Sequence, residues 1–221
     1  LAVWLAVFVF GGSKVGVGQT LLAYDDANNY ASWTNGSNAG YGFGAWDLWN
    51  DGAGGHFLQS SHFGVVNTGG KAFGMWGSPG YANAQRILNE PLRPGREFRI
   101  ELNVFDIASG VRGIDLMNNA YQVLFNFEVS EFGYGATSWD HIANSHIVMR
   151  VVPTNWGVFQ VYLSRGAESW TSGPIQGEFD RFKLYVGNTS GGSGNDFFFN
   201  KLQVVSAGRL FLADGLRMPG T

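Results

Sequence analysis

The sequence has no cysteine among its 221 residues. This absence excludes disulfide bonds, zinc–thiolate and iron–sulfur centres, and a cysteine nucleophile. Charged residues make up only 14% of the chain, against about 25% in an average soluble protein. The 14 Lys and Arg residues are scattered and the net charge is −3. This argues against a nucleic-acid partner, because phosphate contacts need clustered basic side chains.

The residues that are abundant are glycine and the aromatics. The chain has 33 glycines, and aromatic residues make up 15% of it. A disordered chain would be poor in aromatics, and a coiled coil would be rich in Glu, Lys and Leu at heptad spacing. Both classes are therefore excluded, and the composition predicts an all-β protein with many turns.

The first ten residues, Leu1–Phe10, are all apolar. The run is too short for a bilayer span, which needs about 20 residues, but it matches the apolar region of a secretory signal peptide. Small residues at Gly16 and Gly18 offer a cleavage site just before Gln19 or Thr20. We therefore predict that residues 1–19 are a signal-peptide remnant. The protein would then be a bacterial one that is secreted or displayed on the cell surface. The mature chain would have no transmembrane span; the alternative for the apolar run is a buried strand.

Alternating patterns predict strands through the rest of the chain. The clearest is 96–105, where Phe98, Ile100 and Leu102 alternate with charged residues, as expected for a strand with one buried face. About ten to twelve such strands at turn spacing indicate a single antiparallel β-sandwich over residues 20–205. Residues 206–221 break the pattern and form either a tail or the start of a further segment.

Three passages resemble a known group of proteins: residues 23–46, residues 67–74, and residues 179–185 with 196–204. Together they are similar to bacterial secreted proteins, many of unknown function and some with a PEP-CTERM sorting tail. The closing pattern F-x-N-x-L-x-V, from Phe198 to Val204, also resembles concanavalin A-like and laminin G-like jelly rolls. The resemblance implies a jelly-roll sandwich; its motifs mark strands and loops rather than chemistry.

The same resemblance implies a position for a metal. In concanavalin A-like jelly rolls the first and last strands pair side by side, which would bring Asp25 and Asp26 close to Asn195 and Asp196. Such domains often hold a structural calcium, and calcium prefers carboxylate and amide oxygens. The four residues are therefore a candidate calcium site. The alternative is that they only form turns.

A carbohydrate-binding face needs flat aromatic rings beside polar side chains. The best local match is Trp46-Asp47-Leu48-Trp49, where strand parity places Asp47 and Trp49 on one face and Trp46 with Leu48 on the other. The candidate ligand-binding residues are Trp46, Asp47, Trp49, His56, Trp139 and Trp170. The alternative for each Trp is a place in the core of the sandwich.

These features favour a non-catalytic binding module whose partner is a polysaccharide or surface glycan. One alternative is a structural or adhesive matrix protein without a small ligand. A second is a polysaccharide hydrolase or lyase, which needs two carboxylates facing a groove. No Glu-x-Asp-x-Glu string occurs, although Glu101 and Glu128 could face each other across neighbouring strands.

Overall fold

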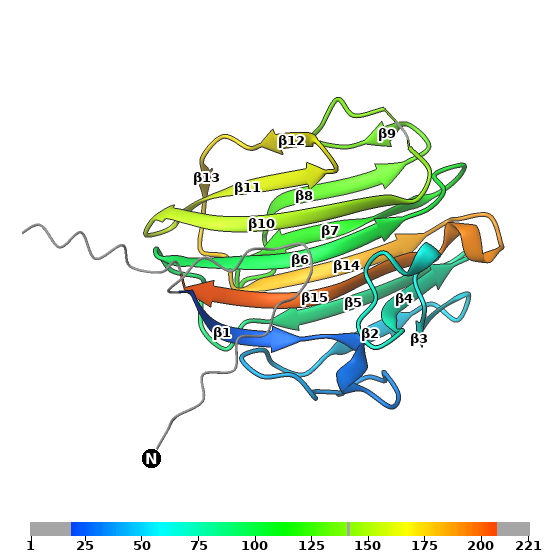
Figure 1. The fold of residues 1–221 in the computed structure, drawn as a ribbon, viewed down its shortest axis with the longest axis horizontal. Helices are drawn as coiled ribbons and strands as arrows, with labels where there is room; N and C mark the ends of the chain where they lie inside the picture. The colour runs from blue at the N-terminus through cyan, green and yellow to red at the C-terminus, as the bar shows by residue number, and fades with distance from the viewer. Residues whose placement is uncertain (1–18, 141, 207–221) are drawn as a thin grey trace, which may run out of the picture.

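The computed structural model describes residues 19–140 and 142–206. They form two antiparallel β-sheets packed face to face (Figure 1), which confirms the predicted all-β sandwich. Apart from Gln19 and Ser206, the predicted signal segment and C-terminal tail lie outside the described residues. Helical structure in the described part is limited to three short 3-10 turns, η1 (Ala27–Asn29), η2 (His62–Gly64) and η3 (Ser193–Asn195), and no helix there could cross a membrane.

The nine-stranded sheet is the front layer in Figure 1. Its order is β12 (Glu168–Thr171), β11 (Val158–Arg165), β10 (Ser145–Asn155), β6 (Arg96–Val104), β15 (Phe197–Ser206), β4 (Ala72–Gly77) and β3 (Gly54–Gln59). Two further strands lie off this path: β1 (Thr20–Asp25) pairs with β15, and β13 (Ile175–Gln176) pairs with β11. The predicted pairing of the first and last strands is therefore confirmed.

The six-stranded sheet forms the other layer. Its order is β2 (Asp47–Asn50), β5 (Tyr81–Ile87), β14 (Arg181–Gly187), β7 (Val111–Met117), β8 (Val123–Ser130) and β9 (Gly133–Tyr134). All pairs are antiparallel, so alternate residues point toward the core and toward solvent. This sheet positions the candidate site.

The core lies between the sheets and is rich in aromatic rings. The predicted alternation in β6 is confirmed, because Phe98, Ile100 and Leu102 are each at most 1% exposed. Phe73 of β4 and Phe199 of β15 stack with ring centroids 5.2 Å apart. Burial of these large rings stabilises the sandwich, by about 25 cal/mol per Å² of apolar surface removed from water.

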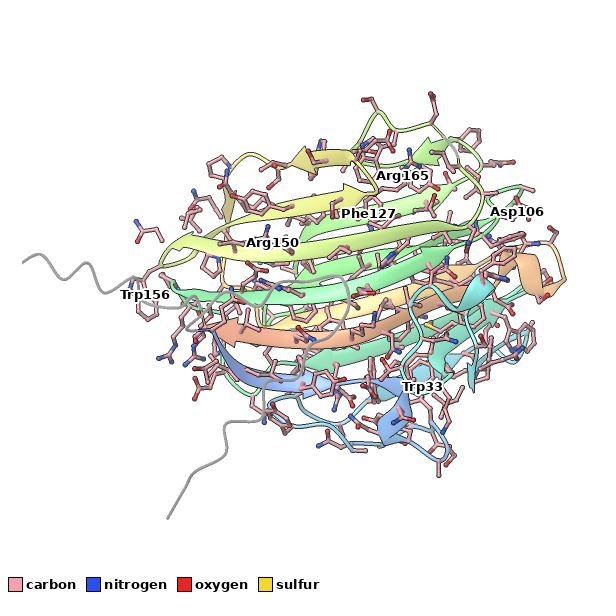
Figure 2. All side chains as sticks on the ribbon, viewed as in Figure 1. Trp33, Asp106, Phe127, Arg150, Trp156 and Arg165 are labelled. Carbon is pink, nitrogen blue, oxygen red and sulfur yellow. The ribbon has the colours of Figure 1, made fainter. Side chains whose placement is uncertain are left out.

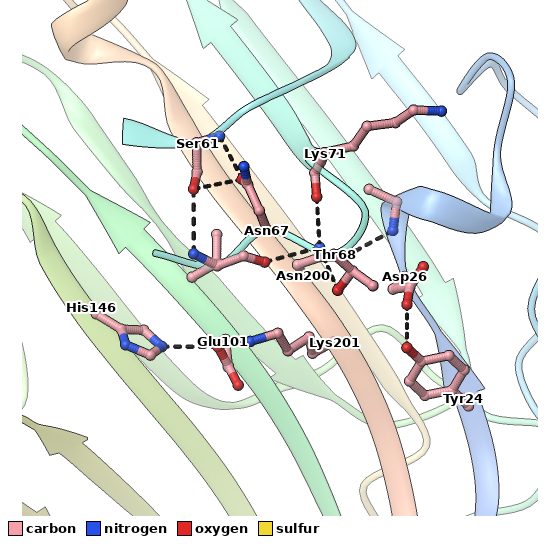
Figure 3. Close-up of polar contacts among 12 residues, drawn as sticks. Tyr24, Asp26, Ser61, Asn67, Thr68, Lys71, Glu101, His146, Asn200 and Lys201 are labelled. Atoms are coloured by element: carbon pink, nitrogen blue, oxygen red, sulfur yellow. Dashed lines mark hydrogen bonds and ion pairs between the residues drawn. The ribbon is translucent and has the colours of Figure 1, made fainter. Parts of the chain in front are cut away.

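A register shift in the middle of β15 lets this one strand pair with two partners on the same side. Phe197–Phe199 pair with β4, and the residues from Leu202 onward pair with β1. Asn200 sits at the shift, where its Oδ1 accepts from the Ala27 amide at 2.8 Å and its Nδ2 donates to the Val66 carbonyl at 2.9 Å (Figure 3). The side chain thus replaces ladder hydrogen bonds that the bulge interrupts.

Candidate functional site

The outer face of the six-stranded sheet carries the candidate site, which we call the platform face. The strand register aligns one row of residues across five strands: Trp49, Asn83, Tyr185, Gly113 and Glu128. The adjacent row is Asp47, Gln85, Lys183, Asp115 and Asn126. Since residues two apart on a strand share a face, both rows point away from the core. The face therefore combines aromatic rings with amide and charged groups.

Two glycines allow tyrosine rings to lie against the sheet. A Cβ at Gly187 would lie 2.0 Å from Cδ1 of Tyr81, its partner in the register, and a Cβ at Gly113 would lie 2.6 Å from the Tyr185 hydroxyl. Each ring thus covers the space that a side chain on the neighbouring strand would fill. Tyr81 remains 39% exposed and Trp49 remains 57% exposed. The Tyr81 and Tyr185 rings thus lie against the sheet rather than standing upright from it.

Hydrogen bonds join the polar groups of the platform face into one network. Asn126 Nδ2 donates to Asp115 Oδ1 at 2.8 Å and to the Tyr185 hydroxyl at 2.7 Å. The Tyr185 hydroxyl donates to Glu128 Oε2 at 3.2 Å, and Lys183 Nζ pairs with Asp115 at 2.8 Å. Burial, with a further contribution from the charge of Glu128, raises the pKa of Tyr185 above its ordinary value. Tyr185 therefore stays a neutral hydroxyl, able to hold this arrangement.

A cavity of about 400 Å³ lies at the end of the platform face where β8 turns into β9. It is an open depression in the surface rather than an enclosed pocket. Phe132, on the turn, is 92% exposed. The lining residues are Ser109, Gly110, Val111, Glu128, Ser130, Glu131, Phe132 and Asn188. Hydroxyl, amide and carboxylate groups thus converge beside an exposed ring.

Asp47 and Trp49 point outward together on the platform face, as strand parity predicts. Trp46 does not belong to this surface, because it is 1% exposed and its ring lies 5.3 Å from that of Trp33 and 5.4 Å from that of Phe73. The prediction that Trp46 binds ligand is therefore wrong: it faces the core.

His56, Trp139 and Trp170 lie away from the platform face. His56 Nε2 contacts the Asn83 carbonyl at 2.8 Å, and burial lowers the pKa of the imidazole, so this histidine bridges the two sheets. Trp139 and Trp170 are half-buried and pack against the core. The structure thus brings together only Asp47 and Trp49 from the predicted ligand-binding set.

The predicted calcium set is not assembled. The register places Asp25 opposite Leu202, six residues beyond Asp196 on β15, which is about 20 Å along a strand. Asp25 is fully buried, pairs with Arg86 and accepts a hydrogen bond from the Tyr30 hydroxyl at 2.6 Å.

The other members of the set have local roles or lie far from Asp25. Asp26 Oδ1 accepts from the Asn28 amide at 2.8 Å, and its other oxygen accepts from the Tyr24 hydroxyl (Figure 3). Asn195 belongs to η3 and Asp196 follows it. Within residues 19–140 and 142–206, no three His, Cys, Asp or Glu side chains are grouped so that they could hold a metal ion.

Glu101 and Glu128 do not face each other either. Glu101 lies on β6, on the outer face of the nine-stranded sheet, where it pairs with Lys201 and His146, each at 2.9 Å (Figure 3). Glu128 lies on β8 of the opposite sheet. The strands that carry them are not neighbours, so this pair cannot flank a common substrate.

Asp196, which lies between η3 and β15, provides a test of the electrostatics of the fold. Burial raises the pKa of its carboxyl from 3.8 to about 6, although the charge of Arg112 acts in the opposite direction. Because the folded-state pKa lies above the unfolded value, the ionised carboxylate destabilises the fold at neutral pH. This penalty begins to decrease as the pH falls below about 6 and is nearly lost by the unfolded value of 3.8. We expect Asp196→Asn to stabilise the protein at neutral pH by about 1 kcal/mol after solvent screening, and to have no such effect near pH 4.

Denaturant unfolding of Asp196→Asn and the wild type at both pH values measures this difference. A variant that is less stable than the wild type at neutral pH would show that the Asp196 carboxylate is needed in its ionised form.

Comparison with one solved structure, a sialidase, supports the fold assignment. The sialidase superposes with a TM-score of 0.50 at 12% sequence identity, over 84% of this chain and 18% of the sialidase. A protein of unknown function from Shewanella oneidensis MR-1 has a TM-score of 0.47 at 9% identity, covering 89% of this chain and 90% of its own. Winged bean acidic lectin, solved with methyl-α-D-galactose, has a TM-score of 0.44 at 9% identity, over 85% of this chain and 98% of the lectin.

These likenesses concern the fold alone. The chain spans about 18% of the length of the sialidase it resembles. No family model matches the sequence. No curated protein matches it in sequence. The resemblance to bacterial secreted proteins therefore stays a prediction.

The sequence analysis missed most of the platform face. Its tyrosines and glycines lie on neighbouring strands far apart in the sequence: Tyr81 pairs with Gly187, and the Tyr185 hydroxyl lies over Gly113. Asp115 lies on β7, which no alternating pattern indicated. A usable signal exists in β14, where Arg181, Lys183 and Tyr185 alternate with buried Phe182, Leu184 and Val186. This parity alone places Lys183 and Tyr185 on one solvent-facing surface.

Proposed function

We propose that this protein is an exported, non-catalytic module that binds a polysaccharide or surface glycan across the platform face. The observation that carries the proposal is the aromatic surface made by Trp49, Tyr81 and Tyr185, with two of its rings laid over glycine. The apolar C–H faces of sugar rings stack on such rings. Export is supported by the apolar segment at the start of the sequence.

The polar groups around the rings suit sugar hydroxyls. Asn83, Gln85 and Asp47 lie in the same two rows as the aromatic residues and supply both donors and acceptors. Because polar groups at fixed positions beside aromatic rings set the orientation of a ligand, this arrangement favours a specific glycan over non-specific adhesion.

The length of the row favours an oligosaccharide over a single sugar. Trp49 on β2 and Glu128 on β8 are separated by four strand spacings, which is about 19 Å. A chain of several sugar residues laid across the strands would contact the rings and then reach the cavity at the end of the face.

A glycan array probed with the wild type, Trp49→Ala and Trp156→Ala tests this proposal. Trp156 is a matched control, since it is 66% exposed but lies on the turn between β10 and β11 of the nine-stranded sheet, at the left end of the sandwich in Figure 2. We expect Trp49→Ala to weaken binding by about tenfold or more, and Trp156→Ala to bind as the wild type does.

The array should be run with calcium and with a chelator, and binding is expected in both. Equal loss in the two variants would contradict a site on the platform face. A folded protein that binds no glycan would remove the proposal and favour the structural or adhesive role.

Cleavage of the bound polysaccharide is a second candidate function, favoured by one observation. The hydrogen-bond chain through Asn126 and Tyr185 connects the carboxylates of Asp115 and Glu128 and keeps them at most about 9 Å apart, below the upper limit of the separation in inverting glycosidases. The ion pair of Asp115 with Lys183 occupies this carboxylate and counts against such a role. Release of new reducing ends from a bound polysaccharide would establish hydrolysis; an unchanged chain length would leave binding alone.

A further inference from the structure

The cavity at the end of the platform face is acidic. Its lining includes Glu128 and Glu131 but no Lys, Arg or His. Across residues 19–140 and 142–206, neither carboxylate forms an ion pair. Glu128 accepts a hydrogen bond from the Tyr185 hydroxyl, which brings no positive charge. By contrast, the other central carboxylate of the face, Asp115, is neutralised by Lys183. The two glutamates therefore leave a local negative potential where a ligand would enter.

The remaining groups of the cavity suit a sugar ring. The Phe132 ring is 92% exposed, which is costly for an aromatic residue and leaves its surface open to an apolar C–H face or a cation. Ser109, Ser130 and Asn188 add hydroxyl and amide groups to the lining. The cavity thus combines an aromatic surface, hydrogen-bonding groups and uncompensated negative charge in one place.

The wall of the cavity is held in place from beneath. Ser109 Oγ accepts from the Ser190 amide at 2.6 Å, and the Ser109 carbonyl accepts from Arg112 Nη2 at 3.1 Å. Arg112 is fully buried between the sheets, where Asp106 and Asp196 act on its charge. The loop that it supports is therefore organised before a ligand arrives.

We propose that this cavity takes a sugar residue carrying a free, protonated amino group, so that the preferred glycan of the platform face is a polymer of amino sugars. This rests on the proposed function. An ammonium group donates three hydrogen bonds and is attracted both by the carboxylates and by the aromatic ring. Uronic acid and sulfated glycans, by contrast, place negative charge against Glu128 and Glu131.

The test uses two hexasaccharides with the same backbone, the β-1,4 glucosamine hexamer and its fully N-acetylated form. Titration calorimetry is carried out at low salt and at a pH where the amine is protonated. We expect the free-amine hexamer to bind at least about tenfold more tightly, the effect of one charge-assisted hydrogen bond. High salt should reduce this preference, because the carboxylates are open to solvent.

Variants separate the charge effect from general binding. Glu131→Gln should remove most of the preference for the free amine, so that the affinities of the two hexamers become similar. Glu178→Gln, an exposed glutamate outside this cavity, is the matched control and should bind as the wild type does. Glu131 is itself exposed, so its replacement is not expected to disturb folding.

The outcomes distinguish this inference from the proposed function. Equal affinity for the two hexamers, or tighter binding of the N-acetylated one, overturns the amino-sugar preference. If, in addition, a neutral glucan hexasaccharide binds and Trp49→Ala abolishes that binding, the platform face still binds glycans. If no oligosaccharide binds to the folded protein, both proposals fail.

Discussion

Replacing Asp25 by alanine is expected to destabilise the folded protein by about 3–5 kcal/mol, because it leaves a buried guanidinium without its counter-charge. Asp25 is fully buried at the end of β1, and its partner Arg86 on β5 is 1% exposed. The ion pair thus crosses the interior from one sheet to the other. Arg86 Nη2 also donates to Asn38 Oδ1 at 2.5 Å, and Arg86 Nε donates to the Gly44 carbonyl at 2.6 Å.

Urea unfolding of Asp25→Ala and of the wild type measures this effect. Glu90→Ala is the matched control, since it also removes a carboxylate from an arginine, but its pair with Arg96 is largely exposed and its loss should not move the midpoint. An Asp25→Ala midpoint equal to that of the wild type would show that Arg86 is stable in the core without its partner.

Replacing Trp46 by alanine is expected to cost a similar amount, about 3–5 kcal/mol, since it leaves a cavity in the aromatic core. The Trp46 ring lies within 6.0 Å of the rings of Phe73, Phe182 and Phe199, measured between centroids. The Arg86 guanidinium lies 4.9 Å from its centroid. Truncation therefore removes packing from both sheets and a cation–π contact with the buried charge.

Trp49→Ala is the internal control for this prediction. It removes the same side chain three residues away, from a position that is 57% exposed, and should leave the thermal midpoint nearly unchanged. The two variants thus separate stability from binding: Trp46→Ala should lower the midpoint, and Trp49→Ala should weaken glycan binding. Similar midpoints for both variants would contradict the assignment of Trp46 to the core.

Parts of the fold could be predicted from local pattern. The alternation of Phe98, Ile100 and Leu102 with charged residues correctly gave the buried face of β6. The likeness of residues 198–204 to a jelly-roll closing strand correctly implied the pairing of β1 with β15. Strand parity also placed Asp47 and Trp49 on a common outer face. Each inference used only periodicity or the likeness of a short segment.

The central strand of the site could not be found in this way. In β7 the inward positions include Arg112, and the outward ones include Gly113 and Asp115, so neither face shows a clear apolar or polar pattern. A charged residue in the core and a glycine mid-strand are the two features that strand patterns count against. Here the glycine makes room for Tyr185, and the arginine supports the loop beside the cavity.

The platform face itself depends on contacts between distant residues. Tyr81 covers Gly187, more than one hundred positions further along the chain, and this pairing follows from the register of β5 with β14. Register cannot be deduced from the residue types alone, because shifting the pairing by one residue would move the tyrosine away from the glycine. For the same reason the calcium prediction paired the correct strands but placed Asp25 at the wrong end of β15.

Mapping the bound glycan by NMR tests the central claim most directly. The amide signals of the protein would be followed while the oligosaccharide that binds best on the array is added. We predict shifts at Gly113, Tyr185 and Gly187 of the platform face, and none at Arg99 and Arg150 on the outer face of the nine-stranded sheet. Shifts confined to Arg99 and Arg150 would contradict the account, because they would place the glycan on the opposite side of the molecule.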